Sequence, residues 1–243
     1  MSQTDTPRGQ LAAGLRTALP FLASAFPLGV IGGMLGMASG LSAGHTFALS
    51  AILNSGTAQF LATRLLQEHA STTVILLTIL VLSLRMVVYG LALRPHARGF
   101  SAGWRLVLGF GLIDAVFFAV IERLKQPANA RHWRWFFVGV SGAMYAGWLL
   151  ATAVGIGLGS ALPETMLKGL DFPLVAMFGA MLASTLGDRK TYAVMAVTAV
   201  LAVLTNGMPY HVGLLAAALA GASFGAVLDW LQQGQTVAAN VEG

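Results

Sequence analysis

The 243-residue sequence contains no cysteine and very little charge. The absence of cysteine excludes disulfide frameworks, thiolate zinc sites and cysteine nucleophiles. Charged residues make up only 9% of the chain, compared with about a quarter in soluble domains, so the chain lacks the polar surface of a water-facing globule. Together with a mean hydropathy of +0.75, this excludes soluble enzymes and nucleic-acid-binding modules, despite the formal net charge of +5.

Long stretches of the chain carry no charged residue at all. No Asp, Glu, Lys or Arg occurs in the 47 residues between Arg16 and Arg64, or in the 38 residues between Lys190 and Asp229. A membrane-spanning helix needs about 20 apolar residues, so each stretch can hold one or two spans. Backbone groups inside a bilayer must bond to each other, which favours helices. The sequence therefore predicts an all-α, polytopic helical membrane protein and no catalytic activity.

About eight spans are predicted, separated by segments with turn-forming residues. They leave no room for a soluble domain, so residues 1–243 are predicted to form a single integral membrane domain with flexible tails at 1–12 and 232–243. The predicted spans are 17–38, 46–66, 71–93, 104–122, 134–159, 171–187, 191–206 and 211–230.

The distribution of Lys and Arg predicts cytoplasmic N- and C-termini. With eight spans, nine of these residues fall inside and four outside, and Arg85 lies within a span. One loop disagrees, because its Arg94, Arg98 and Arg105 fall on the outer side. Either a partner covers this loop or one of the early segments does not fully cross the membrane.

Small residues recur at every fourth position in two places, which predicts close packing between helices and leaves a sliding surface as the alternative. The two series are Gly32, Gly36 and Gly40, and Gly213, Ala217, Gly221 and Gly225.

One apolar segment has a polar interruption at its middle, including Asn54, Ser55, Gly56 and Gln59. An interrupted membrane helix exposes amide and carbonyl groups, which can bind a substrate carboxylate. The alternative is that these side chains only join helices by hydrogen bonds. Pro27 should kink or unwind the preceding span. We predict that these five residues line a substrate site.

Arg85 and Asp114 are the two further candidates, because charges inside a membrane need a partner. They could hold the carboxylate and the ammonium group of a substrate. Alternatively, Arg85 reaches the membrane surface with its long side chain, or the two residues form a purely structural pair. No histidine or methionine pattern predicts a metal, and no phosphate-binding loop is present. No cofactor is predicted, so transport would depend on a gradient or on exchange.

Several short motifs occur in order over residues 11–231. They are Gly14-Leu15-Arg16-Thr17-Ala18-Leu19-Pro20, Phe26-Pro27-Leu28-Gly29, Gly40-Leu41-Ser42, Ser55-Gly56-Thr57-Ala58-Gln59-Phe60, Leu84-Arg85 with Tyr89-Gly90-Leu91, Asp114, and Gly169-Leu170-Asp171-Phe172-Pro173. Their order and spacing resemble the AzlC/YgaZ family, the large subunit of bacterial branched-chain amino-acid exporters. Ser83 and Ala115 depart from the family pattern, which has Asn and Glu at these places.

The resemblance implies a bacterial plasma-membrane transporter that exports branched-chain or other hydrophobic amino acids by secondary transport. It also implies a small membrane subunit of the AzlD/YgaH type as a partner. Two other functions remain open from the residues alone. The chain could transport a different small solute, or it could be a membrane assembly subunit that does not itself transport.

Overall fold

The computed structural model describes residues 6–125, 132–161 and 189–205, with short helical stretches at 216–217, 220–221 and 223–227. The chain divides into two compact units. The first contains Met1–Glu68 and Ile79–Leu170, and the second contains His69–Thr78 and Asp171–Gly243. The predicted span 171–187, most of the span 211–230 and the tail 232–243 lie outside the described residues.

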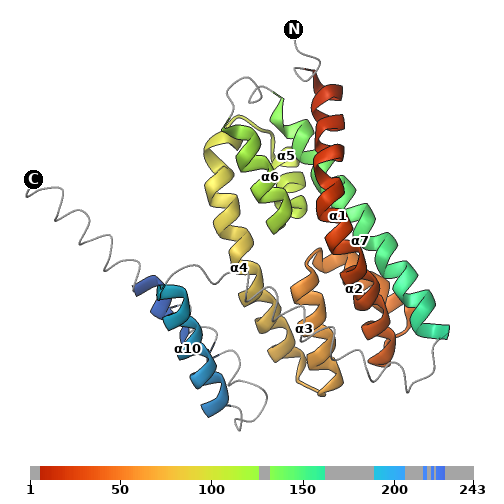
Figure 1. The fold of residues 1–243 in the computed structure, drawn as a ribbon, viewed down its shortest axis with the longest axis vertical. Helices are drawn as coiled ribbons and strands as arrows, with labels where there is room; N and C mark the ends of the chain where they lie inside the picture. Colours follow the sequence, from red (N-terminus) through yellow and green to blue (C-terminus); the bar gives the residue numbers. More distant parts are fainter. Residues whose placement is uncertain are drawn as a thin grey trace, which may run out of the picture. The chain divides into compact units, whose positions relative to one another are not determined.

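The described elements are all helices, and all but α10, with 16 residues, fall into two length classes (Figure 1). Three are long and apolar enough to cross a membrane: α1, α4 and α7. Four others have 10 to 12 residues, or about 15–18 Å, which is about half of a bilayer core. The helices are α1 (Pro7–Ala38), α2 (Ala43–Leu53), α3 (Gly56–Gln67), α4 (Thr72–Ala97), α5 (Ala102–Gly111), α6 (Asp114–Leu124), α7 (Trp133–Ala161) and α10 (Arg189–Leu204).

Helices α1 and α7 run parallel and pack through glycines along their whole length. Near the start of both helices, Gly14 lies against the backbone of α7 around Gly139. Further along, Gly33 lies against the backbone around Gly155. At all four positions a Cβ atom would meet backbone atoms of the other helix, so only glycine allows this approach.

Helices α2 and α3 form a hairpin that enters from the C-terminal end of α1. Thr46, in the first turn of α2, lies against Gly36 near the end of α1. The start of α3, at Gly56, faces Trp148 in the middle of α7. One turn later, Gln59 faces Gly32, which is closer again to the end of α1. The chain therefore turns back halfway along the α1–α7 pair, here called mid-depth, and leaves on the side from which it entered.

Helices α5 and α6 form a second hairpin that enters from the opposite end. Before α5, Phe100 stacks on Trp133 at the start of α7, with ring centroids 5.4 Å apart. The end of α5, at Gly111, faces Ser141 two turns further along α7. At the end of α6, Arg123 donates to Gln10 near the start of α1. This hairpin also turns back at mid-depth.

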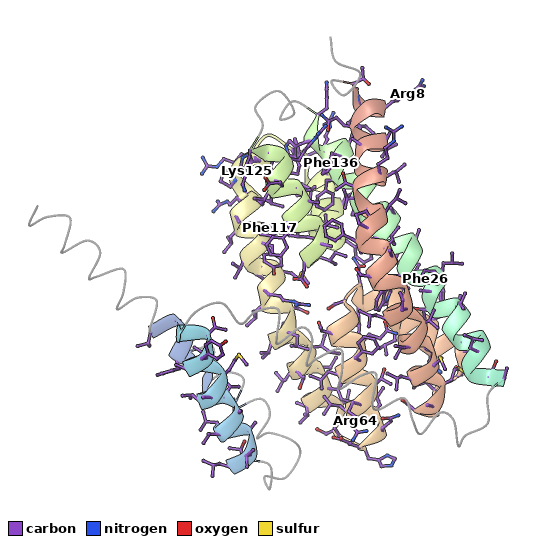
Figure 2. The ribbon with its side chains drawn as sticks, in the orientation of Figure 1. Arg8, Phe26, Arg64, Phe117, Lys125 and Phe136 are labelled. Carbon is purple, nitrogen blue, oxygen red and sulfur yellow. The ribbon has the colours of Figure 1, made fainter. Side chains whose placement is uncertain are left out.

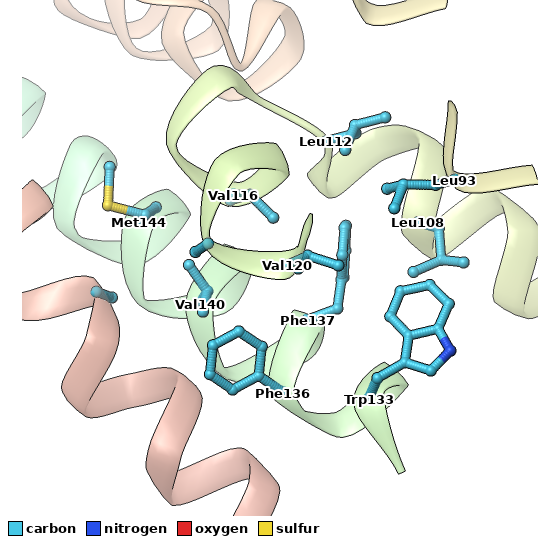
Figure 3. Packing of buried hydrophobic residues seen from close by; sticks show 12 residues of the cluster. Leu93, Leu108, Leu112, Val116, Val120, Trp133, Phe136, Phe137, Val140 and Met144 are labelled. Carbon is cyan, nitrogen blue, oxygen red and sulfur yellow. The ribbon is translucent and has the colours of Figure 1, made fainter. Parts of the chain in front are cut away.

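Buried apolar side chains fix the second hairpin against α4 and α7 (Figure 3). Val116 and Val120 of α6 and Phe137 and Val140 of α7 are fully buried at the centre of this cluster. Ala18 of α1 joins the same cluster, so the hairpin contacts both long parallel helices.

In the second unit, α10 packs against the small-residue stripe that the sequence predicts to be a packing surface. Gly221 lies against Thr198 of α10, and Gly225 lies 3.5 Å from Val194, measured from its ideal Cβ position. Ala217 of the same stripe is buried. In the first unit, Gly32 and Gly36 likewise face the α2–α3 hairpin.

The structure confirms a helical protein with interrupted helices. It differs from the prediction because two of the predicted spans turn back to the end from which they start instead of crossing. The predicted spans 46–66 and 104–122 are each a hairpin of two half-helices. The loop containing Arg94 and Arg105 consequently lies at the same end as the N-terminus. This is the second of the two explanations for that loop, an early segment that does not fully cross. Figure 2 shows Arg8 and Lys125 at this end and Arg64 at the other.

Two details of the first helix also differ from prediction. α1 stays helical through Pro20 and Pro27, so the predicted possibility of unwinding at Pro27 is wrong. α1 already begins at Pro7, where the Thr6 hydroxyl accepts from the Gly9 amide. Residues 7–12 are therefore helical rather than part of a tail, and Gln10 is fully buried.

Candidate functional site

The tips of the two hairpins meet and are joined by a hydrogen bond. Asn54 ends α2 in the left-handed conformation, with φ of 43°, and its Nδ2 donates to the carbonyl oxygen of Phe110 at 2.7 Å. Phe110 lies in the last turn of α5, where carbonyl groups lack partners within the helix. The polar interruption read from the sequence therefore contacts a second interruption, between Gly111 and Asp114.

The second half of each hairpin begins with free backbone amides. Neither Ser55, which precedes α3, nor Ile113, which precedes α6, makes a side-chain capping hydrogen bond to the described residues. The first turn of a helix carries a partial positive charge and unpaired N–H groups. Two such ends at mid-depth make this region favourable for a negatively charged group.

Arg85 of α4 connects the two hairpin tips. Its guanidinium lies 3.0 Å from the carboxylate of Asp114, the first residue of α6. Its other terminal nitrogen donates to the hydroxyl of Thr57, in the first turn of α3, at 2.8 Å. Arg85 and Asp114 therefore lie together, as both a shared substrate site and a purely structural pair require. Both side chains keep partial exposure, at 28% and 39%, so the pair is not sealed inside the protein.

Tyr89, one turn beyond Arg85, holds the other carboxylate oxygen of Asp114. Its hydroxyl donates to that oxygen at 2.9 Å. Its ring stacks on Phe117 of α6 at a centroid distance of 4.3 Å, which fixes the hydroxyl in place. Asp114 thus has a partner for each oxygen and also lies at the positive end of α6.

Gln59 provides a buried donor beside the first tip. Its Oε1 accepts from the indole nitrogen of Trp148 at 3.1 Å. Its Nε2 is buried and has no hydrogen-bond partner among the described residues. A buried polar group without a partner costs about 1–3 kcal/mol, so a ligand group that reached this nitrogen would remove that cost.

The remaining predicted residues occupy different surroundings. The Ser55 hydroxyl lies 3.3 Å from that of Thr57, and Gly56 lies against the Trp148 ring. Pro27 is exposed on α1, and its part in a site stays a prediction. Of the predicted site residues, four lie at the hairpin tips, and Arg85 of α4 connects the tips. The four are Asn54, Ser55, Gly56 and Asp114.

Sequence reasoning missed Thr57, Tyr89 and Trp148. Thr57 is a polar residue within the interruption, so the sequence pattern could have placed it among the predicted site residues. Tyr89 lies one helical turn from Arg85, on the same face of α4. Trp148 gave no signal, because aromatic residues are common in apolar helices.

The family model described as AzlC protein matches residues 20–162, which is more than half of the chain and includes both hairpins. The chain belongs to the AzlC family. No solved structure matches this AzlC-family chain.

Relatives of this AzlC-family chain are named as membrane or transport proteins. Inner membrane protein YgaZ of Escherichia coli (strain K12) is 28% identical over 193 residues, covering 75% of this chain and 76% of the relative. Branched-chain amino acid transport protein AzlC of Bacillus subtilis (strain 168) is 28% identical over 176 residues, covering 70% and 67%. An uncharacterized membrane protein of Archaeoglobus fulgidus is 26% identical over 210 residues, covering 86% and 90%. These names and the apolar helices indicate a multi-pass membrane protein.

Replacing Gln59 by Leu tests whether the free Nε2 acts on a ligand. The change removes this donor and leaves the Trp148 N–H without its acceptor. We expect a normal membrane level and an about tenfold loss of transport, the size of one lost hydrogen bond to a charged group. Trp148→Phe is the matched control, because it breaks the same bond but keeps Nε2. Equal losses in both variants would assign the effect to the Gln59–Trp148 bond instead.

Proposed function

We propose that this AzlC-family protein is an amino-acid transporter that exports branched-chain or other hydrophobic amino acids by gradient-driven secondary transport. The observation that supports this most directly is the meeting of two half-helix tips around the Arg85–Asp114 pair. Interrupted helices at mid-depth are a recurrent form of substrate site in secondary transporters.

The chemistry of the tips fits an amino-acid zwitterion. The carboxylate would bind to Arg85, Thr57 and the free amides at the start of α3. The ammonium group would bind to Asp114, with Tyr89 holding the carboxylate in position. In the structure the two charges neutralise each other at 3.0 Å, so each has a partner before a substrate would bind.

The choice of a hydrophobic side chain rests on the family and on the apolar surroundings. The Bacillus subtilis relative is named a branched-chain amino acid transport protein. In this chain, Phe110 and Trp148 provide apolar surface close to the tips. Such surface favours Val, Leu, Ile or Met and does not distinguish among them, since one methylene changes binding by only about 1–3 kcal/mol.

Charge supports a cytoplasmic N-terminus. Among the described Lys and Arg of the first unit, apart from Arg85, only Arg64 lies at the outer end. The others lie at the N-terminal end of α1, here called the basic end, which would face the bacterial cytoplasm. They are Arg8, Arg16, Arg94, Arg98, Arg105, Arg123, Lys125 and Arg134.

Efflux of labelled leucine from preloaded vesicles tests the proposed function. We expect the purified chain, reconstituted with its small partner, to release leucine, valine, isoleucine or methionine faster than protein-free vesicles under an imposed gradient. Release of none of the four would contradict amino-acid export. Release of another solute from the same vesicles would support the alternative of a different small-solute transporter.

We also expect a small helical membrane subunit of the AzlD/YgaH type to co-purify with the chain. α4 leaves many large apolar side chains exposed, including Leu80, Val87 and Leu91. A partner helix could cover this face in addition to lipid. The measurement is tagged purification in mild detergent followed by mass spectrometry and efflux with and without the subunit. Full activity of the single chain would contradict a need for the partner.

A further inference from the structure

The first unit contains an internal sequence repeat with a spacing of 59 residues. Residues 38–44 read Ala-Ser-Gly-Leu-Ser-Ala-Gly, and residues 97–103 read Ala-Arg-Gly-Phe-Ser-Ala-Gly, so five of seven positions are identical. At the same spacing, Arg64-Leu65 matches Arg123-Leu124 at the end of each hairpin.

The helices repeat with the same spacing. α1 ends at Ala38 and α4 ends at Ala97, while α2 begins at Ala43 and α5 begins at Ala102. Each hairpin starts with a serine that caps its first helix, Ser42 for α2 and Ser101 for α5. Each copy is thus one long helix followed by a half-depth hairpin: α1–α2–α3 and α4–α5–α6.

The two copies run in opposite directions. The α2–α3 hairpin enters from the C-terminal end of α1, and the α5–α6 hairpin enters from the N-terminal end. α4 passes from the tips at Arg85 to the basic end at Leu93, which packs in the same cluster as Trp133. The copies therefore form an inverted-topology repeat, in which the site lies where the repeats meet.

Equivalent carbonyl groups receive hydrogen bonds at both tips. Ala51 and Phe110 are 59 residues apart, and each lies in the last turn of the first half-helix. The Ala51 carbonyl accepts from the Tyr145 hydroxyl at 3.0 Å, and the Phe110 carbonyl accepts from Asn54 at 2.7 Å. The Tyr145 bond thus joins the tip of the α2–α3 hairpin to α7, and the Asn54 bond joins the tips of the two hairpins to each other.

We propose that the two hairpins are the two gates of this protein, each opening toward the membrane face from which it enters. This proposal goes beyond the proposed function, since it concerns access rather than substrate. Opening of α2–α3 would uncover Thr152 of α7. This residue is fully buried, and its hydroxyl oxygen lies 3.0 Å from that of Ser50. Opening of α5–α6 would uncover Ser141, which lies beneath Gly111. Two gates of inverted topology give alternating access without a rearrangement of the glycine-packed α1–α7 pair.

Single cysteines test the two gates without any substrate, because the natural chain has no cysteine. A membrane-impermeant maleimide is applied to right-side-out and to inverted vesicles. Ala43→Cys and Ala102→Cys are matched controls: both residues are exposed and follow the capping serine of their hairpin. We expect Thr152→Cys to react from the same face as Ala43→Cys, and Ser141→Cys from the same face as Ala102→Cys. Reaction of the thiols at positions 152 and 141 from one face, or of neither, would overturn the proposal.

Disulfide locks test whether both gates move during transport. We expect oxidation of Ser50→Cys with Thr152→Cys, or of Gly111→Cys with Ser141→Cys, to stop leucine efflux reversibly. A lock between Leu22→Cys and Gly147→Cys joins α1 to α7 and should leave efflux unchanged. Full efflux with either hairpin locked would overturn the proposal. If the unlocked protein does not move leucine, the labelling pattern still decides on the gates, so a wrong substrate and a wrong gate are distinguishable.

Discussion

Neutralising both Arg85 and Asp114 is expected to abolish transport while leaving the protein in the membrane. The pair is the central contact of the site, at 3.0 Å, and its partners Thr57 and Tyr89 remain in the double variant. Replacing both charges leaves no unpaired charge in the bilayer, and a buried ion pair often stabilises a protein little more than neutral residues do. In Arg85→Gln with Asp114→Asn, we therefore expect a normal membrane level and an about 100-fold loss of efflux, for two lost charged contacts.

The single changes separate binding from folding. Arg85→Gln alone leaves Asp114 without its cation, at a cost of about 3 kcal/mol, so its membrane level should fall below that of the double variant. Glu122→Gln with Lys125→Gln is the matched control, because this pair is 2.7 Å apart but highly exposed. This control should change neither the membrane level nor the efflux by more than about twofold, as is typical of a surface pair. Normal efflux by the Arg85 and Asp114 double variant would reject the zwitterion role, and its loss from the membrane would indicate a structural pair.

The first interruption could be predicted from the sequence and the second could not. Around Asn54, five of eight consecutive residues are polar or glycine, which is unusual within an apolar segment. The second interruption falls at Leu112 and Ile113, which are apolar and suit a continuous helix. There the helix ends because Gly111 packs against α7 and Asp114 pairs with Arg85, and both causes are tertiary.

Only indirect evidence in the sequence indicates that each hairpin returns to the side from which it enters. A segment such as 46–66 has the length of one span, and its composition does not say whether the chain crosses or returns. The arginines between Arg94 and Arg105 did carry this information, because they conflict with eight simple spans. Comparing the chain with itself at a spacing of 59 residues would have shown the repeat, and with it the equivalence of the two segments.

The glycine contact between α1 and α7 yields the prediction with the largest effect on stability. A Cβ atom at Gly155 would meet the Val30 carbonyl group and lie 3.0 Å from the Gly33 Cα. These are backbone atoms, which cannot rotate away as a side chain could, so the two helices must separate along their contact. Overpacking costs about 1–3 kcal/mol for small additions, and Gly155→Leu should reach the upper end of this range.

Gly157→Leu provides the comparison for Gly155→Leu, since the two glycines are two residues apart on α7. At Gly157, no heavy atom of the described residues lies within 4 Å of an added Cβ. A loss of about 3 kcal/mol corresponds to a fall in Tm of about 6–12 °C for a chain of this length. Thermal unfolding in detergent should therefore show this fall for Gly155→Leu and a change of less than about 2 °C for Gly157→Leu, a difference smaller than 1 kcal/mol. Equal melting of the two variants would show that α1 and α7 can separate at this contact without cost, and the parallel pair would then not be the fixed frame on which both hairpins close.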